Sequence, residues 1–200
     1  QLLEARAKVS ELRRQHDRLV RYVEKKYTAY HRLRYDLHTE TVQSVQRDLL
    51  QPGQTLLEYF TGDSAIFIHV VRPDGYRMVR VPRDFPLEDL VQDLRSGIMD
   101  CGPESDLPAA LGRYARAAHQ LYQKLIAPVA ADIPAGDRII LVPDGLLTYI
   151  PFEALLTEPP TDLMDWHRYK YWVLRHDISY CYSATLLREM RDRKHRAEPE

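Results

Sequence analysis

Residues 138–156 read RIILVPDGLLTYIPFEALL, and this stretch decides the fold class. It opens on an apolar run over 138–142 that is rich in β-branched side chains, and the PDG sequence at 143–145 ends the run with turn residues. We expect a strand buried on both faces of a sheet. A short helix over 151–156 should follow, with Pro151 at its first position. Ligands often bind at such strand ends, but this one contains no nucleophile, base or phosphate-binding loop, so we interpret it as a capped strand end.

The run LVPDGLLTYIPFEALL, residues 141–156, resembles the signature of the CHAT domain, a caspase-like module often fused to tetratricopeptide repeats. Two further stretches fit that family in the same order. Residues 56–63 (LLEYFTGD) are similar to its opening strand, and residues 178–187 (ISYCYSATLL) resemble its strand-to-helix step. Tyr182 departs from the pattern, which has proline there. The joint match covers roughly residues 50–190 and implies an α/β fold, namely a caspase-like mixed sheet flanked by helices.

The resemblance also carries expectations about activity. The catalytic His and Cys of the family lie further along than residue 200, so the chain should be the N-terminal, non-catalytic half of a CHAT domain. The resemblance implies a parent cysteine peptidase that cleaves a protein partner after activation by a helical-repeat sensor, as in bacterial defence systems. The alternative is a CHAT-like pseudoenzyme, a non-catalytic interaction module that binds partners through a helical arm and an aromatic loop. A strand ending in His and a later strand ending in Cys beyond Glu200 would favour the peptidase.

Composition limits the function classes. The chain has 28 basic and 29 acidic residues, so its net charge of −1 gives no field that would attract nucleic acid or an anionic membrane. No apolar run approaches the ~20 residues that cross a bilayer, and the N-terminus lacks a signal-peptide core. Cys101 and Cys181 lie in unrelated local patterns, which favours reduced thiols in a cytoplasmic protein. The chain opens on Gln1 rather than Met, which suggests a segment of something longer.

Residues 1–51 contain neither Gly nor Pro, and we expect them to form a helical arm or linker. A heptad stripe over the first 33 residues, interrupted by two polar residues, indicates either the end of an upstream helical-repeat region or a coiled-coil dimer. The tyrosines and arginines of 27–35 could stack on single-stranded nucleic acid, but we favour a helix end that packs its rings. A second helix should span 40–50, with Thr39 as its N-cap. The stripe comprises Leu2, Ala5, Val9, Leu12, His16, Leu19, Val23, Lys26, Tyr30 and Leu33.

Residues 52–190 are expected to form the α/β domain. Strand patterns over 55–60, 65–71 and 76–81, with hairpin-length connections, predict an antiparallel meander at one edge of the sheet. His69 lies within the second of these strands, where a cross-strand or core histidine is more common than a catalytic base.

Two helices should separate the meander from the strand at 138–142. They are expected over 86–98, capped by Asp84, and over 108–129, capped by Asp106. The order strand, helix, helix, strand implies a crossover that covers one face of the sheet.

The last third should contain a surface loop after residue 156, strands at 171–175 and 177–182, and a helix from 184 capped by Ser183, with a frayed tail over 191–200. An aromatic cluster in the loop could line a recognition groove, but pinning the loop to the body is the commoner use and our preferred interpretation. The cluster comprises Trp166, His167, Tyr169, Tyr171 and Trp172.

We assign no catalytic, cofactor-binding or metal-binding residue to this segment. Metal and nucleotide motifs such as CxxC, HExxH, Walker A and GxGxxG do not occur in the sequence. A cysteine peptidase needs a thiolate activated by an imidazole, and neither Cys101, in a loop, nor Cys181, at a strand end, shows that arrangement. We expect no cofactor and no peptidase activity from the segment alone. The expected partners are the C-terminal catalytic half, upstream helical repeats and a protein substrate or activator.

Overall fold

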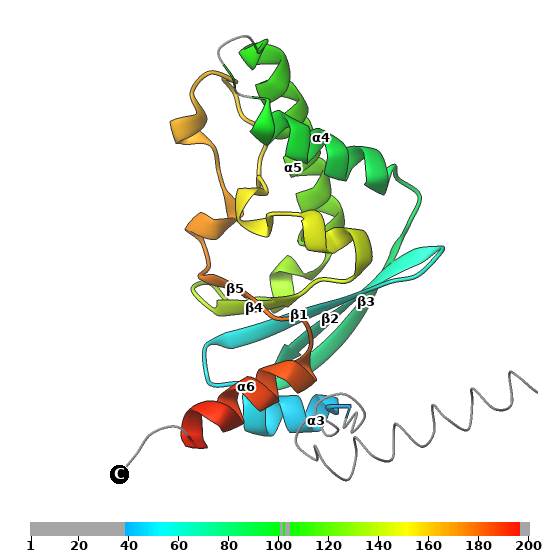
Figure 1. Ribbon diagram of the computed structural model, residues 1–200, viewed down its shortest axis with the longest axis vertical. Helices are drawn as coiled ribbons and strands as arrows, with labels where there is room; N and C mark the ends of the chain where they lie inside the picture. The colour runs from blue at the N-terminus through cyan, green and yellow to red at the C-terminus, as the bar shows by residue number, and fades with distance from the viewer. Residues whose placement is uncertain (1–38, 101, 103–104, 197–200) are drawn as a thin grey trace, which may run out of the picture. The chain divides into compact units, whose positions relative to one another are not determined.

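The computed structural model describes residues 39–100, 102 and 105–196 (Figure 1). The chain divides into two units, 1–39 and 40–200, and residue 39 is the one described residue of the first unit. The expected heptad stripe, the 27–35 segment and Cys101 therefore lie outside them. Residues 40–51, which the sequence pattern grouped with the arm, are part of the second unit.

A five-stranded mixed sheet forms the centre of this unit, in the order β3-β2-β1-β4-β5. β1, β2 and β3 make the expected antiparallel meander, whereas β1, β4 and β5 run parallel to one another. The predicted α/β class with a mixed sheet is confirmed. The strands are β1 Gln54–Thr61, β2 Ala65–Arg72, β3 Gly75–Pro82, β4 Arg138–Val142 and β5 Ile178–Tyr180.

β4 is the buried central strand that its sequence predicts. Its apolar residues from Ile139 to Val142 are at most 5% exposed, and β1 and β5 pair with it on either side. Strands buried on both faces read as continuous apolar runs because neither face meets water. Ile139 and Leu141 join the larger core, whereas Ile140 and Val142 join a smaller one on the opposite face.

Helices α4 (Leu87–Met99) and α5 (Leu107–Leu125) cover one face of the sheet and form the expected crossover between the meander and β4 (Figure 1). They cross closely at Gly97, where an added Cβ would lie 2.7 Å from the Cβ of Tyr114. Glycine at this position therefore sets the separation of the two helices.

The ends of these helices differ in part from expectation. Asp106 caps α5 as predicted, since its carboxylate accepts a hydrogen bond from the Ala109 N–H at 3.1 Å. Asp84 does not cap α4, because its carboxylate contacts Lys124 instead. α5 also stops at Leu125, and a 3-10 helix, η2 (Ala127–Asp132), follows. Pro128 lacks the N–H that would continue the α-helical ladder, which explains the early end.

The segment between β4 and β5 is built from 3-10 turns: η3 (Gly145–Tyr149), η4 (Phe152–Ala154), η5 (Trp166–Arg168) and η6 (Trp172–Leu174). The short helix expected after the turn is thus a 3-10 helix, with Pro151 at its N-cap rather than its first position.

The prediction of a strand over 171–175 was wrong. Tyr171 forms only an isolated bridge to Leu156, after which the backbone turns and buries Trp172 in the core. β5, the second strand expected in this region, is present, although only Ile178–Tyr180 pair as a strand.

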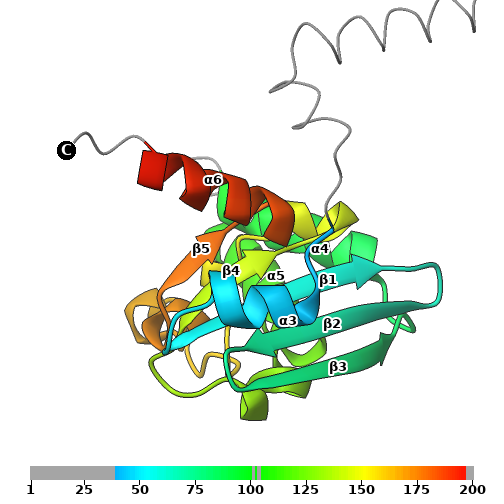
Figure 2. The same cartoon turned by 90° about the horizontal axis from the view of Figure 1, so that it is seen from below.

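The opposite face of the sheet carries α3 (Val42–Ser44), the π-helical turn η1 (Val45–Leu49) and α6 (Ala184–Arg196) (Figure 2). The N-cap of α3 is Thr41 and not Thr39, because Thr41 and Ser44 bond reciprocally through side chain and backbone. Ser183 caps α6 as predicted, accepting from the Leu186 N–H at 3.1 Å. The helix continues to Arg196, beyond the point at which we expected fraying.

Candidate functional site

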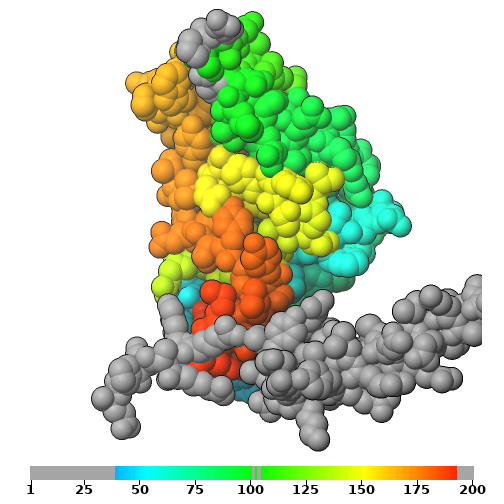
Figure 3. Space-filling view, in the orientation of Figure 1, coloured from blue at the N-terminus to red at the C-terminus, as the bar shows by residue number. Residues whose placement is uncertain are grey.

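A groove crosses the end of the sheet at which β4 and β5 finish. Its first part, about 530 Å³, lies between the end of α4, residues 148–153 and Tyr180. The adjoining hollow of about 260 Å³ shares Thr148 and Tyr180 with it. A third hollow of about 410 Å³ shares Pro143 and Tyr182 with the second and reaches the end of β1. Figure 3 shows this side of the molecule, where residues 145–155 (yellow) lie between α4 (green) and the segment after residue 170 (orange).

The turn after β4 is locked to the end of β1. The Asp144 carboxylate accepts a hydrogen bond from the Thr61 N–H at 2.8 Å, so it is not used to cap η3. Gly145 has φ +55°, a left-handed conformation that glycine adopts without strain. The PDG turn therefore fixes the ends of two parallel strands relative to each other and shapes one wall of the groove.

Tyr180 joins β5 to the 3-10 turn η4. Its hydroxyl accepts from the Phe152 N–H at 3.0 Å and donates to Glu153 Oε2 at 2.6 Å. Burial, followed by the hydrogen bond to Glu153, raises the pKa of Tyr180 above its ordinary value. The protonated phenol donates to Glu153 and so links β5 to the floor of the groove.

Charged groups mark the two ends of the groove. The Arg95 guanidinium lies 5.3 Å from the centroid of the Tyr149 ring, a cation–π contact at the α4 end. Glu58 lines the β1 end and stands opposite His69 in the β1/β2 register. Within the described part of the chain neither Arg95 nor Glu58 forms an ion pair. The surface between them is aromatic and exposed, with Tyr149 at 59% and Tyr182 at 88%.

The described His and Cys side chains have structural contacts. His69 Nδ1 lies 2.9 Å from the Tyr76 hydroxyl across β2 and β3, so the cross-strand interpretation is confirmed. The Cys181 thiol donates to the Ser183 carbonyl at 3.2 Å. His119 and His176 each contact a backbone carbonyl. These contacts stabilise loops and strands.

The aromatic cluster mainly packs its loop against the body of the domain, which agrees with the preferred interpretation. Tyr169 and Trp172 are each 2% exposed, and Tyr169 stacks on Tyr114 of α5 with ring centroids 6.3 Å apart. Tyr114 in turn donates to the Ala154 carbonyl at 2.5 Å. Trp166 is 43% exposed and remains available at the surface.

Between residues 39 and 196, leaving out 101, 103 and 104, no three His, Cys, Asp or Glu side chains gather as a metal site would require. None of the helices in the same part of the chain has the length and apolar character to cross a membrane.

Sequence reasoning singled out neither the groove nor its main residues. Tyr149, Glu153 and Tyr180 come from three separate elements, and no spacing in the sequence links them. The available signal was weak: Tyr149 and Tyr182 lie in the segments that follow β4 and β5.

Comparison with known proteins supports the resemblance. The family model of the CHAT domain matches residues 115–200, which confirms the similarity inferred from the sequence. Two of the three stretches, 141–156 and 178–187, fall inside this match, and residues 56–63 fall outside it. No curated protein matches the chain. The match relates the chain to a caspase-like, peptidase-related family.

Proposed function

We propose that this chain, whose residues 115–200 match the CHAT domain, is the N-terminal, non-catalytic part of a CHAT-family cysteine peptidase. Its role is to supply one side of a longer sheet and to hold a binding groove beside the catalytic residues of the part that follows. The observation that carries the proposal is the position of β5, a short strand at the edge of a sheet whose parallel strands end at the groove.

β5 is suited to receive another strand. It pairs with β4 from Ile178 to Tyr180, and the Cys181 N–H donates to the Leu141 carbonyl. Among residues 39–100, 102 and 105–196 no strand pairs with its other edge. Strand ends are common positions for catalytic residues in parallel sheets. A parallel strand added there would place its carboxyl end beside Tyr180 and the groove.

The groove is the proposed contact surface for a protein substrate or activator. Its exposed tyrosines offer flat rings for apolar side chains, and Tyr and Arg are enriched where proteins bind one another. Arg95 at one end and Glu58 at the other provide charges that are free to pair with a bound segment. These features support binding of an extended peptide across the ends of β4 and β5.

The remaining parts of the proposal rest on the family and the sequence. Upstream helical repeats would continue into the N-terminal residues that precede Glu40 and act as the sensor that activates the peptidase. The chain has no excess of basic charge for direct contact with nucleic acid, and its cysteine usage favours the cytoplasm.

A second candidate is an interaction module without catalysis. The observation in its favour is the groove itself, which exposes Tyr149 and Tyr182 to solvent and needs no reaction to bind a partner. In that case binding a partner at this groove would be the whole function of the domain.

Peptide cleavage distinguishes the two candidates. The parent protein and the 200-residue chain would each be incubated with a peptide library, and the products identified by mass spectrometry. We expect turnover by the parent alone, and loss of turnover when Tyr180→Ala removes the groove floor. Peptide binding by a parent that cleaves nothing would establish the interaction module instead, and cleavage by the 200-residue chain would refute the non-catalytic assignment.

A further inference from the structure

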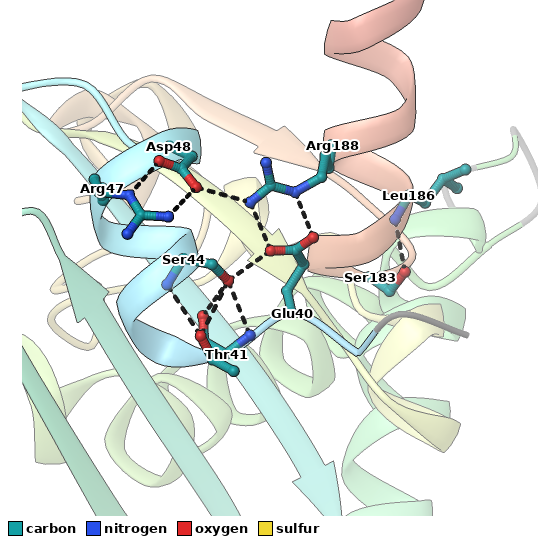
Figure 4. A network of polar contacts seen from close by, with 8 residues as sticks. All are labelled: Glu40, Thr41, Ser44, Arg47, Asp48, Ser183, Leu186 and Arg188. Carbon is teal, nitrogen blue, oxygen red and sulfur yellow. Dashed lines mark hydrogen bonds and ion pairs between the residues drawn. The ribbon is translucent and has the colours of Figure 1, made fainter. Parts of the chain in front are cut away.

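Glu40 is the first residue of the compact unit and is oriented by the first turn of α3 (Figure 4). Thr41 and Ser44 form a reciprocal capping box, with N–H to oxygen distances of 2.9 and 3.1 Å. The Ser44 hydroxyl also donates to Glu40 Oε2 at 2.6 Å. The local sequence thus presents the Glu40 carboxylate in one fixed direction.

Arg188 of α6 meets that carboxylate from the other end of the chain. Its Nη2 donates to Glu40 Oε2 at 2.7 Å, and its Nε donates to the second carboxylate oxygen. The same Nη2 lies 3.3 Å from Asp48, which Arg47 also binds (Figure 4). The Glu40 side chain is 8% exposed, and hydrogen bonds from Arg188 lower its pKa. A two-pronged, partly desolvated pair of this kind is among the stronger polar contacts available to a protein.

α6 buries little apolar surface against the sheet. Over the part of the helix whose side chains the structure describes, 184–192, only Ala184 is buried, and Leu187 is partly buried against the smaller core. Arg191 adds a hydrogen bond to the Leu49 carbonyl. Elements with little buried apolar surface open at low free energy. The docking of α6 therefore depends strongly on its arginine contacts with residues 40–49.

α6 is also directly connected to the groove. Residues 181–183 join it to β5, which pairs with β4 over only three residues. The Tyr180 hydroxyl at the end of β5 holds Phe152 and Glu153 in the groove floor. Undocking of α6 would leave this end of β5 held by its short ladder and by the hydrogen bonds of the Tyr180 hydroxyl.

We propose that Glu40 and Arg188 form a latch that couples the position of the chain at residue 40 to the docking of α6 and, through β5, to the groove floor at Tyr180. Glu40 is the first residue of the unit that spans 40–200. A displacement of the chain there separates the two charges, releases α6 and loosens Tyr180. This coupling depends on the geometry alone and does not require the proposed peptidase activity.

Amide hydrogen exchange of the 200-residue chain, resolved by residue with NMR, tests the latch. The variants Glu40→Gln and Arg188→Gln each remove the ion pair. We expect exchange at the Leu187 and Cys181 amides to rise on the order of tenfold or more, because a hydrogen-bonded charge pair is lost. The Phe152 amide, which donates to Tyr180, should exchange faster as well, whereas β2 amides should be unchanged and report that the sheet is folded.

The matched control is Arg77→Gln, which removes an ion pair of 2.7 Å with Asp132 on the far side of the sheet and should leave all three reporter amides unchanged. Charge reversal, Glu40→Arg with Arg188→Glu, should restore part of the protection, because a carboxylate at position 188 would also lie near Asp48. Unchanged Leu187 exchange in both single variants would overturn the latch. Faster exchange at Leu187 with no change at Phe152 would overturn its coupling to the groove.

Discussion

Gly97→Ala should destabilise the protein by separating α4 from α5. An added Cβ would lie 2.7 Å from the Tyr114 Cβ, 2.8 Å from the Tyr114 nitrogen and 2.9 Å from the Ala110 oxygen. None of these atoms can rotate away, so the helices themselves must shift. Overpacking of this kind costs roughly 1–3 kcal/mol, and we take the upper end because all three contacts are with rigid atoms. Alanine regains about 1 kcal/mol of helix propensity.

The expected loss of unfolding free energy is therefore about 2 kcal/mol, measured by urea denaturation. A domain of this size should show a fall in melting temperature of about 2–4 °C for each kcal/mol. The control is Gly112→Ala in α5, where the added Cβ would meet only a Leu163 side-chain carbon at 3.7 Å. That variant should be neutral or slightly more stable, by up to about 1 kcal/mol. If Gly97→Ala were as stable as Gly112→Ala, the close crossing of the two helices would be refuted.

Three further substitutions or conditions test other parts of the fold. Leu141→Ala, at a fully buried position in β4, should cost about 2–5 kcal/mol in urea unfolding, and a loss under 1 kcal/mol would contradict its central place. Asp106→Ala removes the α5 cap and should cost about 1 kcal/mol, whereas Asp84→Ala, which removes no cap, should cost less. Arg188 lowers the pKa of Glu40 below its ordinary 4.5, so this ion pair contributes stability above about pH 4.5 that is lost as pH falls through the lowered pKa. The unfolding free energy of Arg188→Gln should consequently fall less than that of the unsubstituted protein as the pH is lowered through this range. Identical pH dependence in the two proteins would contradict the contribution of the ion pair.

Elements with strong local signals could be predicted from the sequence. β4 is a short run rich in β-branched residues and ended by a PDG turn, and the meander strands are separated by turn residues at hairpin spacing. Asp106 was recognised as a cap because a polar acceptor precedes an apolar helical face. In these segments local preference and tertiary structure agree.

Other features depend on contacts that a linear pattern does not contain. The run 171–175 has strand-like composition, but burying Trp172 outweighs that preference and turns the backbone. Asp84 precedes a helix in sequence yet pairs with Lys124, 40 residues away. The Glu40–Arg188 pair joins residues 148 positions apart, and no periodicity links them. The groove is missed for the same reason, since its walls come from α4, η3 and β5.

The proposed function requires that a further strand of the parent protein pairs with the edge of β5 that no strand among residues 39–100, 102 and 105–196 occupies. The Cys181 N–H donates to the Leu141 carbonyl of β4. Because successive amides of a strand point to opposite sides, the Tyr180 N–H points away from β4, toward the edge that the added strand would occupy. Hydrogen exchange at the Tyr180 amide, compared between the 200-residue chain and the intact parent, measures this pairing directly. We expect fast exchange in the chain and strong protection in the parent; fast exchange in both would contradict the account.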